Sequence, residues 1–160
     1  AEQSAADPML RGMATTASAV WIVDAVTAVV GHVGDSRVYV WRGERIERVT
    51  HDHSWVEEQV RAGALRPSDA RQHPWRNVVT RAIAGGTDPV VDLVDLPIHP
   101  GDRVVLCSDG LSSVVTDERL ERALADRQPP AATCDRLVEL ANSEGGPDNI
   151  TVVAIDIHAA

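Results

Sequence analysis

Three aspartates stand at the ends of apolar, β-branched segments of this chain. Asp35 follows the segment 27–33, and Asp109 follows the segment 103–107. Asp148 stands just before the last apolar segment. Each has a neighbouring glycine or Gly-Gly-Pro run that allows close backbone approach. A single aspartate of this kind usually marks a turn, and Asp-Gly is typical of hairpins. Three in one antiparallel sheet favour a shared edge at which carboxylate oxygens converge.

Converging carboxylates would form an all-oxygen site. Such a site suits Mg²⁺ or Mn²⁺ better than Zn²⁺, which prefers nitrogen and sulfur ligands. Two hard cations that share a carboxylate lower the pKa of a bound water and hold a phosphoryl oxygen, so no protein nucleophile is needed. The pattern alone leaves turn formation and helix capping as the alternative interpretation.

Other polar residues have simpler explanations. His51, His53 and His73 could be drawn as a zinc site, but His-x-His in a polar loop is more typical of capping or surface positions. His32, inside an apolar strand, is expected to be a hydrogen-bonded core residue. Arg37 could bind phosphate, but its place on an alternating strand favours a structural ion pair.

The amino-acid composition of the chain argues against several classes of function. The 160 residues are enough for one domain, 1–160, and 44% of them are hydrophobic. The formal charge of −9, from 15 basic and 24 acidic residues, argues against nucleic-acid and membrane-surface binding. No apolar run approaches the ~18 residues of a membrane span. With two cysteines and no visible signal peptide, we expect a cytoplasmic protein.

The elements that would position the aspartates form an α+β pattern. Strands are expected first, then a polar helical insertion, then further strands with two amphipathic helices over a sheet. The expected strands are 15–23, 27–33, a hairpin over 38–49, 90–98, 103–107 and 150–157. Helices are expected to start after Ser54, near Pro67, after Thr116 and at Pro130, and Asp109-Gly110 reads locally as a turn.

Five motifs occur in this order between Gly12 and Asp156. They are GMATT (12–16), GHVGDSRVYVWR (31–42), Thr50 with Asp52 and His53, LCSDGLS (106–112) and GGPDNITVV (145–153). In order and spacing they closely resemble the PPM-type metal-dependent protein serine/threonine phosphatases, the protein phosphatase 2C group, and especially its bacterial branch.

The resemblance implies an antiparallel β-sandwich flanked by helices in αββα layers. It also implies that residues 54–81 form a flap beside the active site, here called the flap segment. Positions matched to the family motifs would have these roles: Asp109, Gly110 and Asp148 at a dinuclear metal centre, Asp35 at an accessory third metal, and Asn149 and Ser108 as residues that support the ligands.

The activity implied is hydrolysis of phosphoserine and phosphothreonine by water activated by two or three Mn²⁺ or Mg²⁺ ions. The partners implied are a phosphoprotein substrate and a Ser/Thr kinase system. The family's N-terminal strands and helices, with a phosphate-binding arginine and a bridging aspartate, are not found in this sequence. A second chain could supply them. The alternative is a catalytically incomplete fragment or pseudophosphatase that serves as a regulatory or phosphoprotein-binding module.

Overall fold

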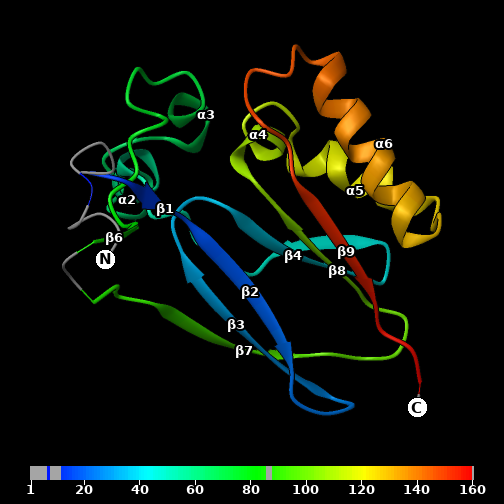
Figure 1. The fold of residues 1–160 in the computed structure, drawn as a ribbon. Coiled ribbons are helices and arrows are strands. Elements are labelled where there is room, and N and C mark those ends of the chain that lie inside the picture. Colours follow the sequence, from blue (N-terminus) through cyan, green and yellow to red (C-terminus); the bar gives the residue numbers. More distant parts are fainter. Residues whose placement is uncertain (1–6, 8–11, 86–87, 160) are drawn as a thin grey trace.

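A computed structural model of the chain describes residues 7, 12–85 and 88–159 (Figure 1). No helix among these residues is long and apolar enough to cross a membrane. The elements, in chain order, are β1 (Ala14–Thr15), β2 (Ala17–Ile22), β3 (Thr27–Val33), β4 (Arg37–Arg42), β5 (Arg45–Arg48), α2 (Trp55–Arg61), α3 (Pro67–Ala70), β6 (Ile83–Ala84), β7 (Asp92–Pro97), β8 (Arg103–Cys107), α4 (Asp109–Ser112), α5 (Asp117–Ala125), α6 (Pro130–Ser143) and β9 (Val152–Asp156).

Two antiparallel sheets pack face to face. One has the strand order β2-β3-β7 and the other β5-β4-β8-β9, while β1 and β6 form a separate two-stranded pair. Alternate residues of each strand point inward, so Val30 of β3 and Val38 of β4 belong to one buried cluster that joins the two sheets. The β-sandwich expected from the sequence is therefore present.

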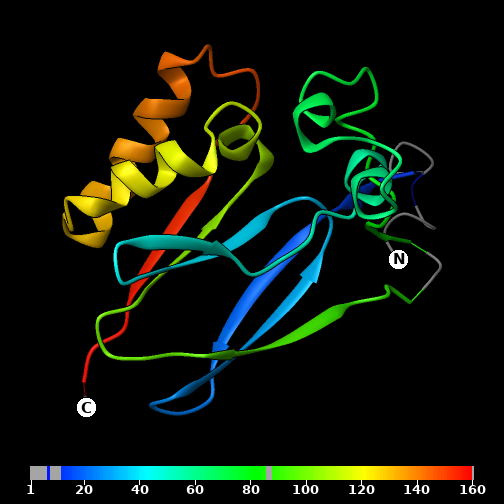
Figure 2. The ribbon, with the colours of Figure 1, turned by 180° about the vertical axis from the view of Figure 1, so that it is seen from behind.

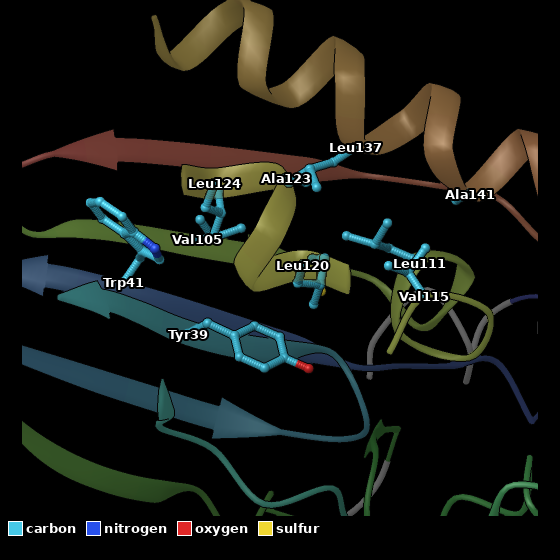
Figure 3. Packing of buried hydrophobic residues seen from close by; sticks show 11 residues of the cluster. Tyr39, Trp41, Val105, Leu111, Val115, Leu120, Ala123, Leu124, Leu137 and Ala141 are labelled. Atoms are coloured by element: carbon cyan, nitrogen blue, oxygen red, sulfur yellow. The ribbon is translucent and has the colours of Figure 1, made fainter. Parts of the chain in front are cut away.

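Helices α4, α5 and α6 cover the other face of the β5-β4-β8-β9 sheet (Figures 1 and 3). Tyr39 and Trp41, which alternate with the inward valines of β4, point toward these helices. Leu120 and Leu124 of α5 and Leu137 of α6 complete this second core. The buried stripe of α5 is the one that its i, i+3, i+4 spacing predicts.

The outer face of the β2-β3-β7 sheet has no helical layer among the described residues. Trp21 is 71% exposed and Leu93 is 74% exposed on this face. The described part of the chain therefore shows three of the four layers of the expected αββα arrangement, with helices on one side of the sandwich only.

The flap segment folds as two short helices between β5 and β6, at one end of the sandwich (Figure 2). Ser54 caps α2, because its side chain accepts a hydrogen bond from the Glu57 amide at 3.3 Å. Helix α2 ends at Arg61, just before Gly63, whose φ of +72° suits a helix end. A main-chain hydrogen bond from the Trp55 amide to the Val78 carbonyl, at 2.9 Å, closes this segment on itself.

Candidate metal centre

Strand register brings the three aspartate-bearing loops to one end of the β5-β4-β8-β9 sheet. Arg37 of β4 lies opposite Cys107 of β8, and Cys107 lies opposite Val152 of β9. The turn before β4, the segment after β8 and the loop before β9 are therefore neighbours. These three segments carry Asp35, Asp109 and Asp148.

Asp109 is the first residue of helix α4, so Asp109-Gly110 is not a hairpin turn. The local turn reading fails because the chain continues into a buried helical turn under α6. Ser108 connects this segment to the loop before β9: its hydroxyl donates to the Asn149 carbonyl at 3.0 Å and accepts from the Thr151 amide at 3.0 Å. Ser108 thereby holds the Asp109 and Asp148 segments side by side.

Gly110 makes this close approach feasible. A β-carbon on Gly110 would lie 2.3 Å from the carbonyl oxygen of Asn149, a distance that no side chain tolerates. Asp148 is exposed, and its Oδ1 accepts a hydrogen bond from the Asn149 amide at 2.7 Å. Gly110 therefore contacts the loop that carries Asp148.

Asp35 lies in the turn between β3 and β4 and is partly buried. Burial raises the pKa of its carboxyl group, and the negative charge of nearby Asp109 raises it further. The two carboxylates thus lie close enough for their negative charges to repel each other.

The side chains at this end of the sheet form only part of a binding site for a hard cation. Among the described residues, no three His, Cys, Asp or Glu side chains are gathered closely enough to hold a metal ion. The Asp148 carboxylate accepts a hydrogen bond from the next residue of its own loop, the Asn149 amide. The donors at this end of the sheet are carboxylate oxygens, which suit Mg²⁺ or Mn²⁺. The histidines drawn as a zinc site are not brought together: His53 is bonded to Gly34, and His73 stacks on Trp55.

A pocket of about 390 Å³ opens between the sheet end and the flap segment. Asp35 and Asp109 line it on one side. On the flap side it is lined by Pro67, Ala70, Arg71, Arg76 and Asn77. Its size suits a small ligand or one side chain with its substituent.

Two inner arginines of the pocket are already paired. Arg37 contacts Asp52 at 2.6 Å, which confirms the structural ion pair expected from the sequence, and Arg48 contacts Glu57 at 2.7 Å. In the part of the chain that the structure describes, Arg71 and Arg76 form no ion pair. Sequence reasoning missed both, because a polar insertion without periodicity gives no sign of which side chains face a site.

Comparison with known proteins identifies the family. Residues 1–148 match the protein phosphatase 2C family. Protein phosphatase PhpP of Streptococcus pneumoniae is 36% identical over 152 residues, which are 95% of this chain and 61% of PhpP. The crystal structure of the serine/threonine phosphatase PstP of Mycobacterium tuberculosis has a TM-score of 0.91 at 38% identity, covering 99% of this chain and 66% of that one.

A second structure holds metal. The catalytic domain of PstP in complex with two manganese ions has a TM-score of 0.88 at 36% identity, and the match covers 99% of this chain and 65% of that chain. The chain thus spans less than two thirds of the proteins that it matches. The match over residues 1–148 shows that this chain belongs to the protein phosphatase 2C family.

Proposed function

We propose that this chain forms the metal-binding part of a protein serine/threonine phosphatase that hydrolyses phosphoserine and phosphothreonine. The observation that carries the proposal is the pairing of Asp35 and Asp109 at one side of a pocket of about 390 Å³. Family membership supports it, and so does the manganese-bound PstP structure.

Asp109 and Asp148 would hold the main metal centre, Gly110 would add its carbonyl oxygen, and Asp35 would hold the accessory ion. Ser108 and Asn149 keep the two loops in contact. Bound Mn²⁺ or Mg²⁺ would neutralise phosphoryl charge and lower the pKa of a water. The family resemblance implies further ligands that this sequence does not contain, and a longer polypeptide or a second chain would supply them.

The flap segment would form the wall against which the substrate lies. Arg71 and Arg76 carry positive charge into a pocket whose other arginines are paired. A phosphate dianion is the complementary ligand. The substrate would be a phosphoprotein, so the enzyme would oppose a Ser/Thr kinase. Its two cysteines are free thiols, which supports a reducing, cytoplasmic setting as part of the proposal.

The test is hydrolysis of an aryl phosphate in Mn²⁺, with and without chelator, by the 160-residue chain alone and by the same chain completed with the longer polypeptide or second chain that supplies the further ligands. Asp109→Asn should abolish turnover, whereas Asp95→Asn, the same change on exposed β7, should leave it unchanged. Turnover that chelator does not reduce would contradict the proposal. A folded chain that binds a phosphopeptide without turnover would favour the alternative, a non-catalytic phosphoprotein-binding module.

A further inference from the structure

His53 holds the turn that carries Asp35. The Gly34 amide donates a hydrogen bond to His53 Nδ1 at 3.0 Å, and the His53 amide donates to the Gly34 carbonyl at 2.7 Å. His53 is only 2% exposed. Both the ring and the main chain of His53 therefore fix the residue directly before Asp35.

The same turn is closed on its other side by Thr16. Gly34 has a φ of +115°, and a β-carbon there would lie 2.3 Å from the Thr16 β-carbon. The Thr16 hydroxyl is also 3.2 Å from the hydroxyl of Ser36, on the far side of Asp35. With neighbours packed against both of its sides, the turn has little room to shift, so its position follows that of His53.

The second ring nitrogen of His53, Nε2, connects the ring to Asp92 of β7. Since Nδ1 accepts a hydrogen bond, Nε2 carries the proton and donates to Asp92 Oδ2 at 3.0 Å. Asp92 of β7 also accepts from Arg81, whose Nη1 is 2.7 Å from Oδ1 and Nη2 3.3 Å from Oδ2. Hydrogen bonds from Arg81 and from His53 lower the pKa of Asp92 to about 2, so the carboxylate stays ionised.

This chain of contacts ends at the flap segment. Arg81 is its last residue, and the Thr80 amide donates to the His53 carbonyl at 2.8 Å. The Thr80 hydroxyl donates to Glu58 of α2 at 2.6 Å. The C-terminal end of the flap segment is therefore bonded to both the main chain and, through Asp92, the side chain of His53.

We infer that His53, held by Asp92 and Arg81, is a positioning residue that sets the place of Asp35. The inference rests on the proposed function, because it assigns Asp35 to a metal ion. Loss of the Asp92 or Arg81 contact would release the His53 ring, loosen the Gly34 turn and thereby weaken the metal affinity of a carboxylate that none of these side chains touches. Groups behind a metal ligand act in this way on affinity.

The test measures Mn²⁺ binding to the 160-residue chain by calorimetry, with Asp35→Asn defining the binding step that needs Asp35. Asp92→Asn and Arg81→Gln should weaken that step about tenfold. Arg81→Lys keeps the charge and should restore part of it. Matched controls are Asp95→Asn on the same strand and Arg66→Gln, an exposed flap arginine paired with Asp69, and both should bind as the wild type does.

Amide hydrogen exchange provides a second readout that needs no metal. The Gly34 amide should exchange faster in Asp92→Asn and Arg81→Gln, while the Val30 amide in mid-strand keeps its protection. Faster Gly34 exchange with unchanged Mn²⁺ affinity would overturn the inference and leave the network purely structural. Arg81, the outermost member, can be changed even where a His53 variant fails to fold. Absence of any Asp35-dependent step would instead overturn the proposed metal centre, and the inference with it.

Discussion

The carbonyl oxygen of Asn149 occupies the space in which a side chain on Gly110 would begin, 2.3 Å from an ideal β-carbon. Gly110 belongs to α4 and Asn149 to the loop before β9, so two segments far apart in sequence touch through their main chains. This contact keeps the loop of Asp148 beside Asp109.

Gly110→Ala is therefore expected to push the loop of Asp148 away from α4. We expect a loss of about 1–3 kcal/mol in the free energy of unfolding, the usual cost of overpacking, and Mn²⁺ binding weaker by about tenfold. Urea unfolding and calorimetry measure the two effects. Gly31→Ala is the control, because its β-carbon would meet Leu93 Cδ2 at an ordinary 3.7 Å. Equal behaviour of the two variants would contradict the packing argument.

Much of the fold follows from local pattern. Strands 27–33 and 103–107 match β3 and β8 to the residue, since turn-forming residues bound both apolar runs. The two-stranded pairing of β1 with β6 and the bridge from Ser54 to Val79 could not be predicted. They depend on contacts between distant segments, and two residues carry no periodicity to reveal them.

The candidate site was predictable in outline. The recurrence of aspartates at strand ends predicted a shared edge, and strand register places the loops of Asp35, Asp109 and Asp148 at one end of the β5-β4-β8-β9 sheet. Metal binding by these three residues stays a prediction. The pattern could not tell that Asp148 bonds to its own loop. It also could not tell that His53 reaches the Asp35 turn, because a histidine in a polar loop is usually exposed.

Asp102 gives the chain a stability that depends on pH. Burial raises the pKa of its carboxyl group, but hydrogen bonds from Arg42 and the His99 amide lower it more, to below its ordinary 3.8. The Arg42 contact is 2.6 Å. A lowered pKa means stability that is present above pH 3.8 and lost as the pH falls through the folded-state pKa.

Arg42→Gln should therefore lower the free energy of unfolding by about 1–3 kcal/mol at pH 7, because the ionised Asp102 loses its charged hydrogen-bond donor. The difference from the wild type should shrink below pH 3.8, where Asp102 becomes protonated in the unfolded state and in the variant. Urea unfolding at pH 7 and pH 3 measures it. Arg66→Gln, which breaks an exposed pair, should cost less than about 0.5 kcal/mol at both. A pH-independent loss in Arg42→Gln would contradict the assignment to Asp102.

The unpaired arginines of the pocket should affect substrate binding. Arg71→Gln is expected to raise KM about fivefold for a phosphopeptide with acidic flanking residues, equivalent to about 1 kcal/mol for a partly solvated charge pair. The value of kcat should not change, since Arg71 lies on the flap side, opposite the aspartates. Steady-state kinetics measure both. Arg61→Gln, an exposed arginine of α2 outside the pocket, should leave KM unchanged; an equal effect there would point to net charge rather than to the pocket.

Asp35 is expected to lower the stability of the metal-free chain and to raise that of the metal-bound one. Its pKa is raised by burial and by Asp109, so its charged form is disfavoured in the folded state. In the wild type the charged carboxylate lowers the free energy of unfolding above the folded-state pKa of Asp35. This destabilisation disappears as the pH falls through that pKa. In chelator at pH 7, Asp35→Asn should therefore unfold with a free energy about 0.5–1 kcal/mol higher than the wild type, within the usual gain from removing a functional group.

Added Mn²⁺ should reverse the order of the two stabilities, because ligand binding stabilises the wild type more. Chemical unfolding in chelator and in Mn²⁺ measures both, with Asp95→Asn as the control. A variant less stable than the wild type in chelator would contradict this prediction and show that Asp35 stabilises the fold by a contact of its own.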